Sequence, residues 1–242
     1  MSSRRRRNIP ELLPFYNDTA LWIDGADHTC FALGAGNLIT ATRDKSPEGN
    51  HPTQATGAKQ PTFTGNGLNG KSVMTFGGAQ TLLIPSPIYT LPNGNNTVYA
   101  VAQRTTESGA ANFLLNLSEA AGSRHYLGYT ATSGNIAFQN RTSDTSILVR
   151  GSNVNTVPNI IRGGRNGTEM AVTVNGLAET TSANGLSEAG CDSAWIGSLR
   201  DSAAYLTGFI AEIIIWRRAL SPAEKAWVDT YLSKKWNIPL YI

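Results

Sequence analysis

The sequence contains few of the residues from which catalytic centres and disulfide-bonded domains are built. Its 242 residues include two cysteines and three histidines, and only 15% of them are charged. Cys30 and Cys191 are far apart, and the N-terminal arginines are followed by no apolar segment that would direct secretion. We therefore expect two buried thiols rather than a disulfide. No apolar run is long enough to cross a bilayer, so we expect no membrane-spanning segment.

Recognisable catalytic patterns are also missing. The histidines show no metal-binding spacing, and no G-x-S-x-G serine motif occurs. The segment from Gly65 to Gly70 reads G-x-G-x-x-G, but a strand pattern follows it where a phosphate-binding turn needs a helix. Hydrolysis of glycosides requires two carboxyl groups, and the apolar strand at 208–216 offers only Glu212, with Ile210 and Ile214 expected on the same face. We therefore predict a protein that is not an enzyme, in which Glu212 is a structural partner of a loop or helix.

Short apolar runs separated by Gly, Asn, Ser and Thr dominate the chain and predict many strands in one domain. Asn175-Gly176 predicts a two-residue hairpin turn that leads into a strand from Leu177 to Thr181. The turn-rich segment from Gly34 to Gly70 is expected to be mostly loop. The other expected strands are Leu21 to Ile23, Ser72 to Phe76, Leu82 to Ile84, Thr97 to Gln103, Asn112 to Leu117, His125 to Tyr129, Ile136 to Gln139, Ser146 to Val149, Asn159 to Arg162, Met170 to Val174, Ala194 to Gly197 and Gly208 to Trp216.

One helix is predicted near the C-terminus. Ser221-Pro222-Ala223-Glu224 has the pattern of a capping box with proline at the first helical position. Apolar residues then recur four apart, lysines occupy the last turn, and the helix is expected to end near Trp236. The order of elements indicates a fold that is completed by one helix laid against a β-sheet.

Several blocks of the sequence resemble laminin-G-like domains of the concanavalin A-like superfamily. They are Leu21-Trp-Ile-Asp24, Arg43 to Ser46 with His51 and Gln54, Gln60-Pro61-Thr62, Gly67 to Gly70 followed by Val73 to Gly78, Val172 to Gly176, and Gly208 to Ile238. The resemblance implies an all-β fold, a two-sheet antiparallel jelly-roll sandwich with one C-terminal helix. This domain would cover residues 16–242, after an extended basic N-terminal arm over residues 1–15.

Domains of this kind serve in adhesion, sugar binding and virion structure, so the fold alone does not select a function. The basic arm favours the phage versions. We interpret the chain as a non-enzymatic virion structural protein, a capsid-decoration, fibre or tail-associated protein on the virion surface, made in the host cytoplasm. It would dock on a viral capsid or tail protein, with self-association left open. The docking residues would be Arg4, Arg5, Arg6, Arg7, Ile9, Leu12 and Leu13.

The alternative interpretation is a carbohydrate-binding or adhesion module that recognises a polysaccharide or a cell-surface glycan. Exposed aromatic side chains are the usual sugar platform on such sandwiches, because the rings offer flat apolar faces with a polar edge. The candidates are Tyr126, Tyr129, Trp195 and Tyr205.

The resemblance also raises the question of calcium, which laminin-G-like domains often hold through an aspartate and loop carbonyl groups. Asp24, Asp27 and Asp44 are the available ligands, with turn capping as their plainer role. We expect no cofactor and leave calcium open. Without its four N-terminal arginines the net charge of +3 becomes −1, so we expect no sequence-specific binding of nucleic acid.

Overall fold

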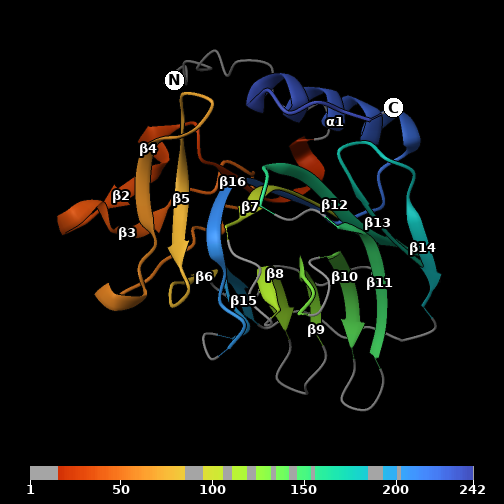
Figure 1. The fold of residues 1–242 in the computed structure, drawn as a ribbon, viewed down its shortest axis with the longest axis horizontal. Coiled ribbons are helices and arrows are strands. Elements are labelled where there is room, and N and C mark those ends of the chain that lie inside the picture. The colour runs from red at the N-terminus through yellow and green to blue at the C-terminus, as the bar shows by residue number, and fades with distance from the viewer. Residues whose placement is uncertain are drawn as a thin grey trace, which may run out of the picture.

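Two antiparallel sheets pack face to face, and the one α-helix of the described residues covers the outer side of the larger sheet (Figure 1). We call the eight-stranded sheet the front sheet and the six-stranded sheet the back sheet. This arrangement confirms the predicted jelly-roll sandwich with a C-terminal helix. The computed structural model describes residues 16–84, 95–105, 111–118, 124–131, 135–141, 146–153, 156–184, 193–200 and 203–241.

The front sheet is built around β16, which pairs with β7 on one side and with β5 and then β1 on the other. In spatial order its strands are β14 (Thr180–Ala183), β13 (Glu169–Val174), β12 (Asn159–Asn166), β7 (Asn96–Arg104), β16 (Thr207–Trp216), β5 (Lys71–Gly77) and β4 (Thr62–Leu68), with β1 (Thr19–Asp24) beside the second half of β16.

The back sheet lies below the front sheet in Figure 1. Its strands, in order, are β11 (Ser146–Asn153), β10 (Asn135–Arg141), β9 (Arg124–Tyr129), β8 (Asn112–Ser118), β15 (Ser193–Ile196) and β6 (Leu82–Ile84). A separate pair is formed by β2 (Phe31–Leu33) and β3 (Ile39–Thr42), and single 3-10 turns occur at Tyr16–Asp18, His28–Cys30, Ala35–Asn37 and Gly57–Lys59.

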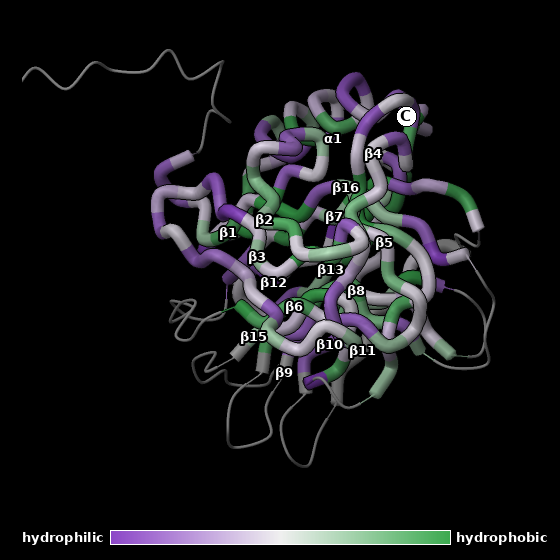
Figure 2. Tube along the Cα trace, turned by 90° about the vertical axis from the view of Figure 1, so that its left-hand side faces the viewer, coloured by the Kyte–Doolittle hydropathy of each residue, from purple (hydrophilic) through white to green (hydrophobic). Residues whose placement is uncertain are grey.

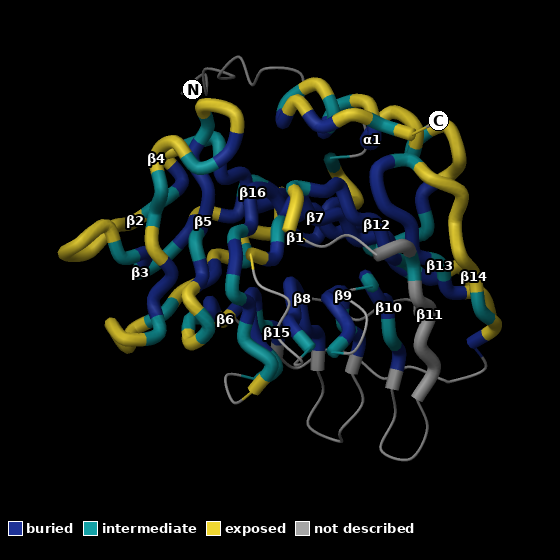
Figure 3. The backbone as a smooth tube through the Cα atoms, viewed as in Figure 1, coloured by how far each residue is buried: buried dark blue, intermediate teal, exposed yellow. Residues whose placement is uncertain are grey.

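Apolar side chains from the facing sides of both sheets form the main core. Figure 2 shows hydrophobic stretches along β16 and β7 inside the molecule, and Figure 3 shows the strands as largely buried while the outer side of the helix is exposed. Representative core residues are Leu21, Phe76, Leu127, Phe138, Ile161, Ile196 and Ile213. Burial of this shared face stabilises the pairing of the two sheets, since neither sheet can cover its own apolar side.

The helix α1 (Pro222–Trp236) begins as the sequence predicts. The Ser221 hydroxyl accepts a hydrogen bond from the Glu224 N–H at 3.3 Å, and the Glu224 carboxylate accepts one from the Ser221 N–H at 2.7 Å. The helix ends at Trp236 and is followed by its C-cap residue Asn237, which adopts a left-handed conformation. Its inner side packs on the front sheet, and the helix residues Val228, Leu232 and Trp236 belong to a second apolar core between helix and sheet. No helix in the described part of the chain is long and apolar enough to cross a membrane.

The structure refines two predictions of secondary structure. The segment from Gly34 to Gly70 contains β3 and β4 as well as loops. β4 is an edge strand with two interior glycines and a register shift, so it lacks the apolar alternation that identifies strands. The chain reverses at Asn175-Gly176 as predicted, with the Leu177 N–H donating to the Val174 carbonyl at 3.0 Å, but pairing resumes only at Thr180.

Cys30 is a free thiol with an exposed fraction of 3%, whereas Cys191 lies outside the described residues. Burial, together with the nearby charge of Asp27, raises the pKa of Cys30 to about 11. Because the thiolate is the reactive form, we expect Cys30 to resist iodoacetamide at about pH 8 in the folded protein and to react in urea. Peptide mass spectrometry measures both rates. Equal rates with and without urea would contradict this prediction.

Candidate functional site

The outer face of the back sheet carries a row of side chains that crosses five strands. By strand register, Leu83 on β6 lies beside Trp195 on β15, Asn116 on β8, Tyr126 on β9 and Gln139 on β10. We call these five residues the aromatic row. Its two aromatic members are partly exposed and lie two strand spacings apart, about 10 Å. The row therefore brings together two residues that the sequence predicts as sugar contacts.

The ring of Tyr126 is held in place by Phe113, whose ring meets it edge to face at a centroid distance of 4.1 Å. A bulge in β8 between Phe113 and Leu115 places the Phe113 side chain on the outer side of the sheet, whereas the Leu115 side chain belongs to the core. Asn116, between the two aromatic residues, has no exposed surface. Trp195 and Tyr126 are thus the partly exposed aromatic residues of the row, and their position on paired strands favours a preorganised binding site.

The other two aromatic candidates have different positions. The prediction of an exposed Tyr129 is wrong, because alternation along β9 directs it to the core beside Leu127, with an exposed fraction of 1%. Tyr205 is partly exposed, and its carbonyl accepts a hydrogen bond from the Asn112 side chain at 3.0 Å. Its backbone therefore lies next to the first residues of β8, near Phe113.

The carboxylate of Glu212 lies between the front sheet and α1, and four donors surround it. One oxygen accepts hydrogen bonds from the Trp22 indole at 2.8 Å and the Tyr231 hydroxyl at 3.1 Å. The other accepts from the Trp236 indole at 2.6 Å and faces the Lys235 ammonium at 2.8 Å. With an exposed fraction of 1%, Glu212 is a structural partner of the helix, as the sequence predicts.

A second carboxylate, Asp24, lies opposite Glu212 on β1. The Lys235 ammonium bridges the two, with 2.6 Å to Asp24, and Lys45 contacts Asp24 from the other side at 2.8 Å. We call Asp24, Glu212, Lys45 and Lys235 the buried ionic cluster. Burial raises the pKa of Glu212, with Lys235 acting against it; burial would also raise the pKa of Asp24, but Lys235 and Lys45 hold it below its usual range. Both carboxylates are enclosed by protein groups, so the pair lacks the solvent-filled groove that a glycosidase needs.

A β-bulge on β16 modifies the predicted orientation of its side chains. The register shifts between Ile210 and Glu212, so Ile210 belongs to the inter-sheet core while Glu212 and Ile214 face the helix. The prediction that Ile210 shares the face of Glu212 is therefore wrong. A bulge reverses the alternation of side chains on one side of the extra residue.

The three aspartates considered for calcium bind protein donors instead. The Asp44 carboxylate accepts hydrogen bonds from the N–H groups of Ser46 and Asn50, each at 2.8 Å. Asp27 caps a 3-10 turn, and Asp24 belongs to the buried ionic cluster. Within the described ranges no cluster of three or more His, Cys, Asp or Glu side chains is placed to hold a metal ion. These residues do not fit a calcium site, because their oxygens already accept hydrogen bonds.

The proposed docking arm, which comprises Arg4, Arg5, Arg6, Arg7, Ile9, Leu12 and Leu13, lies outside the described residues. The first described element is the 3-10 turn at Tyr16–Asp18. Its Asp18 carboxylate pairs with Arg218 at 2.8 Å, just before α1. The described chain therefore begins against the strand-to-helix connection.

The chain matches no protein-family model, and no curated protein sequence is significantly similar to it. It is similar in structure to the binding domain of Paraclostridial Mosquitocidal Protein 1, with 12% identity and a TM-score of 0.61 over 90% of this chain and 53% of that one. It is also similar to the binding domain of botulinum neurotoxin DC in complex with SialylT, with 9% identity and a TM-score of 0.61 over 90% of this chain and 52% of that one. The chain thus spans about half the length of these two binding domains.

A more partial similarity is to the CBM40 module of the Ruminococcus gnavus IT-sialidase, solved with α2,3-sialyllactose bound. It has 18% identity and a TM-score of 0.48 over 57% of this chain and 83% of that one. At such identities the toxin domains establish the fold alone, that of a jelly-roll sandwich found in binding domains. Neither of the two binding domains is described as a virion protein, so the virion interpretation gains no support from them.

Proposed function

We propose that this chain is a non-enzymatic carbohydrate-binding domain and that the aromatic row is its binding surface. The observation that carries the proposal is the alignment of Trp195 and Tyr126 on one outer face. A sugar ring has apolar C–H faces, which pack on aromatic rings, and hydroxyl groups at its edge, which need polar partners. Gln139 is the polar residue at the end of the row.

Three further features support the proposal. Phe113 fixes the Tyr126 ring, which lowers the entropy that binding would otherwise cost. The fold is shared with binding domains, one of which is described in complex with SialylT. Finally, the carboxylate pair at Glu212 is occupied by Lys235 and indole groups and is aimed at the helix rather than at solvent.

The test is binding of the purified chain to an array of immobilised oligosaccharides and polysaccharides. We expect at least one glycan to be retained, and we expect Trp195→Ala to weaken its binding by about 10- to 30-fold, the usual effect of truncating a central aromatic contact. Trp195→Phe, which keeps a ring, should retain most of the affinity. Trp227→Ala is the matched control, since Trp227 is 39% exposed on α1, on the other side of the molecule.

An array without any retained glycan would refute carbohydrate binding. Retention that survives Trp195→Ala and Tyr126→Ala would instead refute the aromatic row as the binding surface. Attachment to a virion through residues 1–15, and location on a virion surface, remain proposals from the sequence alone. They are compatible with a lectin-like domain that faces outward from a particle.

A further inference from the structure

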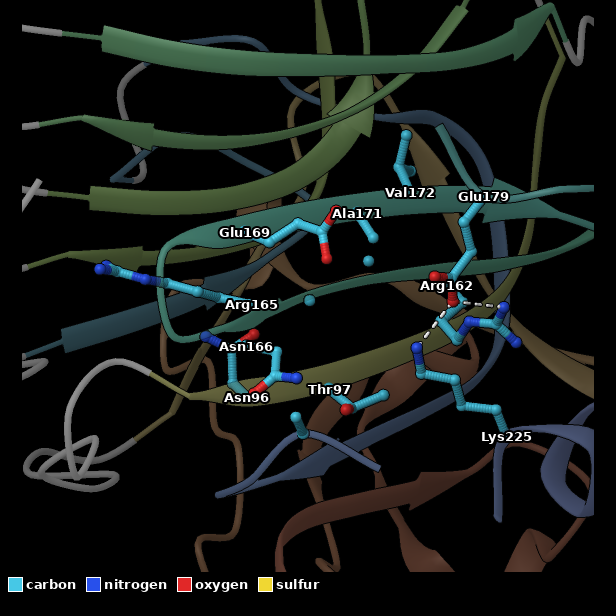
Figure 4. Close-up of a pocket in the computed structure, with 13 residues that line it drawn as sticks. Asn96, Thr97, Arg162, Arg165, Asn166, Glu169, Ala171, Val172, Glu179 and Lys225 are labelled. Carbon is cyan, nitrogen blue, oxygen red and sulfur yellow. Dashed lines mark hydrogen bonds and ion pairs between the residues drawn. The ribbon is translucent and has the colours of Figure 1, made fainter. Parts of the chain in front are cut away.

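A polar cleft lies on the outer face of the front sheet, beside α1 (Figure 4). It is formed by β7, β12 and β13 together with the loop before β14 and one side chain of the helix. Counting the space open to solvent, it has a volume of about 440 Å³. The cleft lies on the opposite side of the sandwich from the aromatic row, because the two occupy the outer faces of different sheets.

Small side chains form the floor of the cleft. By register, Thr97 on β7, Gly164 on β12 and Ala171 on β13 lie side by side. The hydroxyl of Thr97 is turned to the chain before α1, where it donates to the Arg218 carbonyl at 3.0 Å. A Cβ atom at Gly164 would lie 2.6 Å from the Asn96 carbonyl oxygen, so glycine at this position allows the close approach of β7. The residues that line the cleft include no aromatic ring for stacking.

The wall toward the helix carries charges that neutralise each other. Arg162 donates to Asp229 at 2.6 Å and to Glu179 at 2.9 Å. Lys225 on α1 donates to the same oxygen of Glu179 at 2.7 Å (Figure 4). Two cations are thus neutralised by two carboxylates. Further N–H groups of the guanidinium and the ammonium remain, and they can donate hydrogen bonds to uncharged oxygen atoms of a ligand.

The opposite wall is formed by Glu169 on β13 and Asn166 on β12, which are paired residues of these two neighbouring strands. Glu169 lies two residues from Ala171 on the same outer face, and its carboxylate points over the floor in Figure 4. Within the described ranges no hydrogen bond or ion pair engages this carboxylate. From Arg162 to Asn166 along β12, the two walls are about 13 Å apart.

We propose that this cleft is a second carbohydrate site, which binds an uncharged sugar unit through hydrogen bonds. The inference rests on the proposed function, but its site is distinct from the aromatic row. A carboxylate such as Glu169 accepts hydrogen bonds from neighbouring hydroxyl groups of one ring, and the arginine and lysine donate to others. Arg162 and Lys225 are already paired with carboxylates, so the carboxylate of an acidic sugar would be repelled by Glu169 and would find no unpaired cation to offset that repulsion.

Two sites on opposite faces make the domain bivalent. Because the two sites lie on the outer faces of different sheets, separate glycan chains or separate branches can occupy them. Such a domain gains avidity on a dense glycan surface without any increase in the affinity of either site.

The experiment is a titration of the ¹⁵N-labelled chain with methyl glycosides, followed by NMR. The neutral probes are methyl glucoside, methyl galactoside and methyl mannoside, and the acidic probes are the corresponding uronates. The Gly164 amide reports on the cleft, and the Trp195 indole reports on the aromatic row. We expect at least one neutral glycoside to shift the Gly164 amide in a saturable way, and its uronate to shift that amide less.

Variants separate the two sites. Glu169→Ala and Ala171→Phe, which fills the floor, should each abolish the response of Gly164 and leave that of Trp195. Glu169→Gln should reduce the discrimination against the uronate. Trp195→Ala should leave the response of Gly164 unchanged.

If Trp195 responds and Gly164 does not, the second site is refuted while the proposed function stands. If Trp195→Ala removes both responses, there is one site and the proposal is wrong. If neither residue responds and the array also retains no glycan, the proposed function fails together with this inference.

Discussion

Replacement of Lys235 with methionine is expected to lower the free energy of unfolding by about 3–5 kcal/mol. Lys235 is the only cation of the buried ionic cluster that contacts both Asp24 and Glu212, at 2.6 and 2.8 Å. Without it, Glu212 would remain deep beneath α1 as an uncompensated charge, and removal of one partner of a buried pair costs far more than the pair itself contributes. Urea denaturation followed by tryptophan fluorescence measures the change.

The neighbouring Lys234 provides the control, because it lies on the same helical turn and is exposed. Lys234→Met should change the free energy of unfolding by no more than about 0.5 kcal/mol. In the Lys235→Met background, Glu212→Gln should restore part of the loss, since it removes the buried charge. A Lys235→Met protein as stable as the Lys234→Met protein would contradict the role assigned to the cluster.

The pH dependence of this destabilisation follows from the signs of the pKa shifts. In the native protein Lys235 and Lys45 hold the pKa of Asp24 below its unfolded value, so this carboxylate contributes stability above its unfolded pKa and loses it as the pH falls. In Lys235→Met the folded pKa values of Asp24 and Glu212 rise, and the folded state then takes up protons more readily than the unfolded state. We therefore expect the difference in free energy of unfolding between the wild-type protein and Lys235→Met to become smaller as the pH falls from about 8 to about 4.

Substitution of Gly197 by alanine is expected to lower the free energy of unfolding by about 2–5 kcal/mol, from backbone strain and overpacking together. Gly197 follows β15 with a φ of +86°, which residues with a side chain rarely adopt. A Cβ atom there would lie 2.4 Å from the ring of Phe76, which is buried in the core between the sheets. The ring has no free space into which to move, because its neighbours are close-packed.

Gly36→Ala separates the two contributions. Gly36 also has a positive φ, +69°, but no atom lies within 4 Å of the position of its Cβ. This variant should therefore lose only the backbone part, about 1–2 kcal/mol. Equal losses in Gly36→Ala and Gly197→Ala, measured by thermal or urea unfolding, would show that the contact with Phe76 adds nothing.

The sequence predicts the elements that carry strong local signals. The helix at Ser221 has a capping box, and strands such as β7 and β16 have long apolar runs, so their positions follow from local chemistry. β4 is glycine-rich and lies at an edge, where pairing with β5 rather than its own composition decides its conformation. Its existence therefore depends on a partner that local sequence does not identify.

The candidate site was accessible to sequence analysis only residue by residue. Tyr126 and Trp195 could be named as aromatic candidates, but their alignment depends on the register of β8 with both neighbouring strands. Phe113 was missed because a bulge turns it outward, and Asp24 was not paired with Glu212 because it comes from another strand. The cleft leaves even less trace in the sequence, since its floor is defined by the small size of Gly164 and Ala171.

The pairing of β1 with β16 also determines when the protein can fold during synthesis. β1 is made long before β16, which is its only partner strand in the described part of the chain, and the lysine and tryptophan that close over both strands follow β16. The edge of β1 that pairs with β16 must therefore stay unpaired until β16 has been synthesised. Contacts of such long sequence separation slow folding and leave the nascent chain open to unwanted pairing, so the nascent chain is the stage at which this protein most needs chaperones.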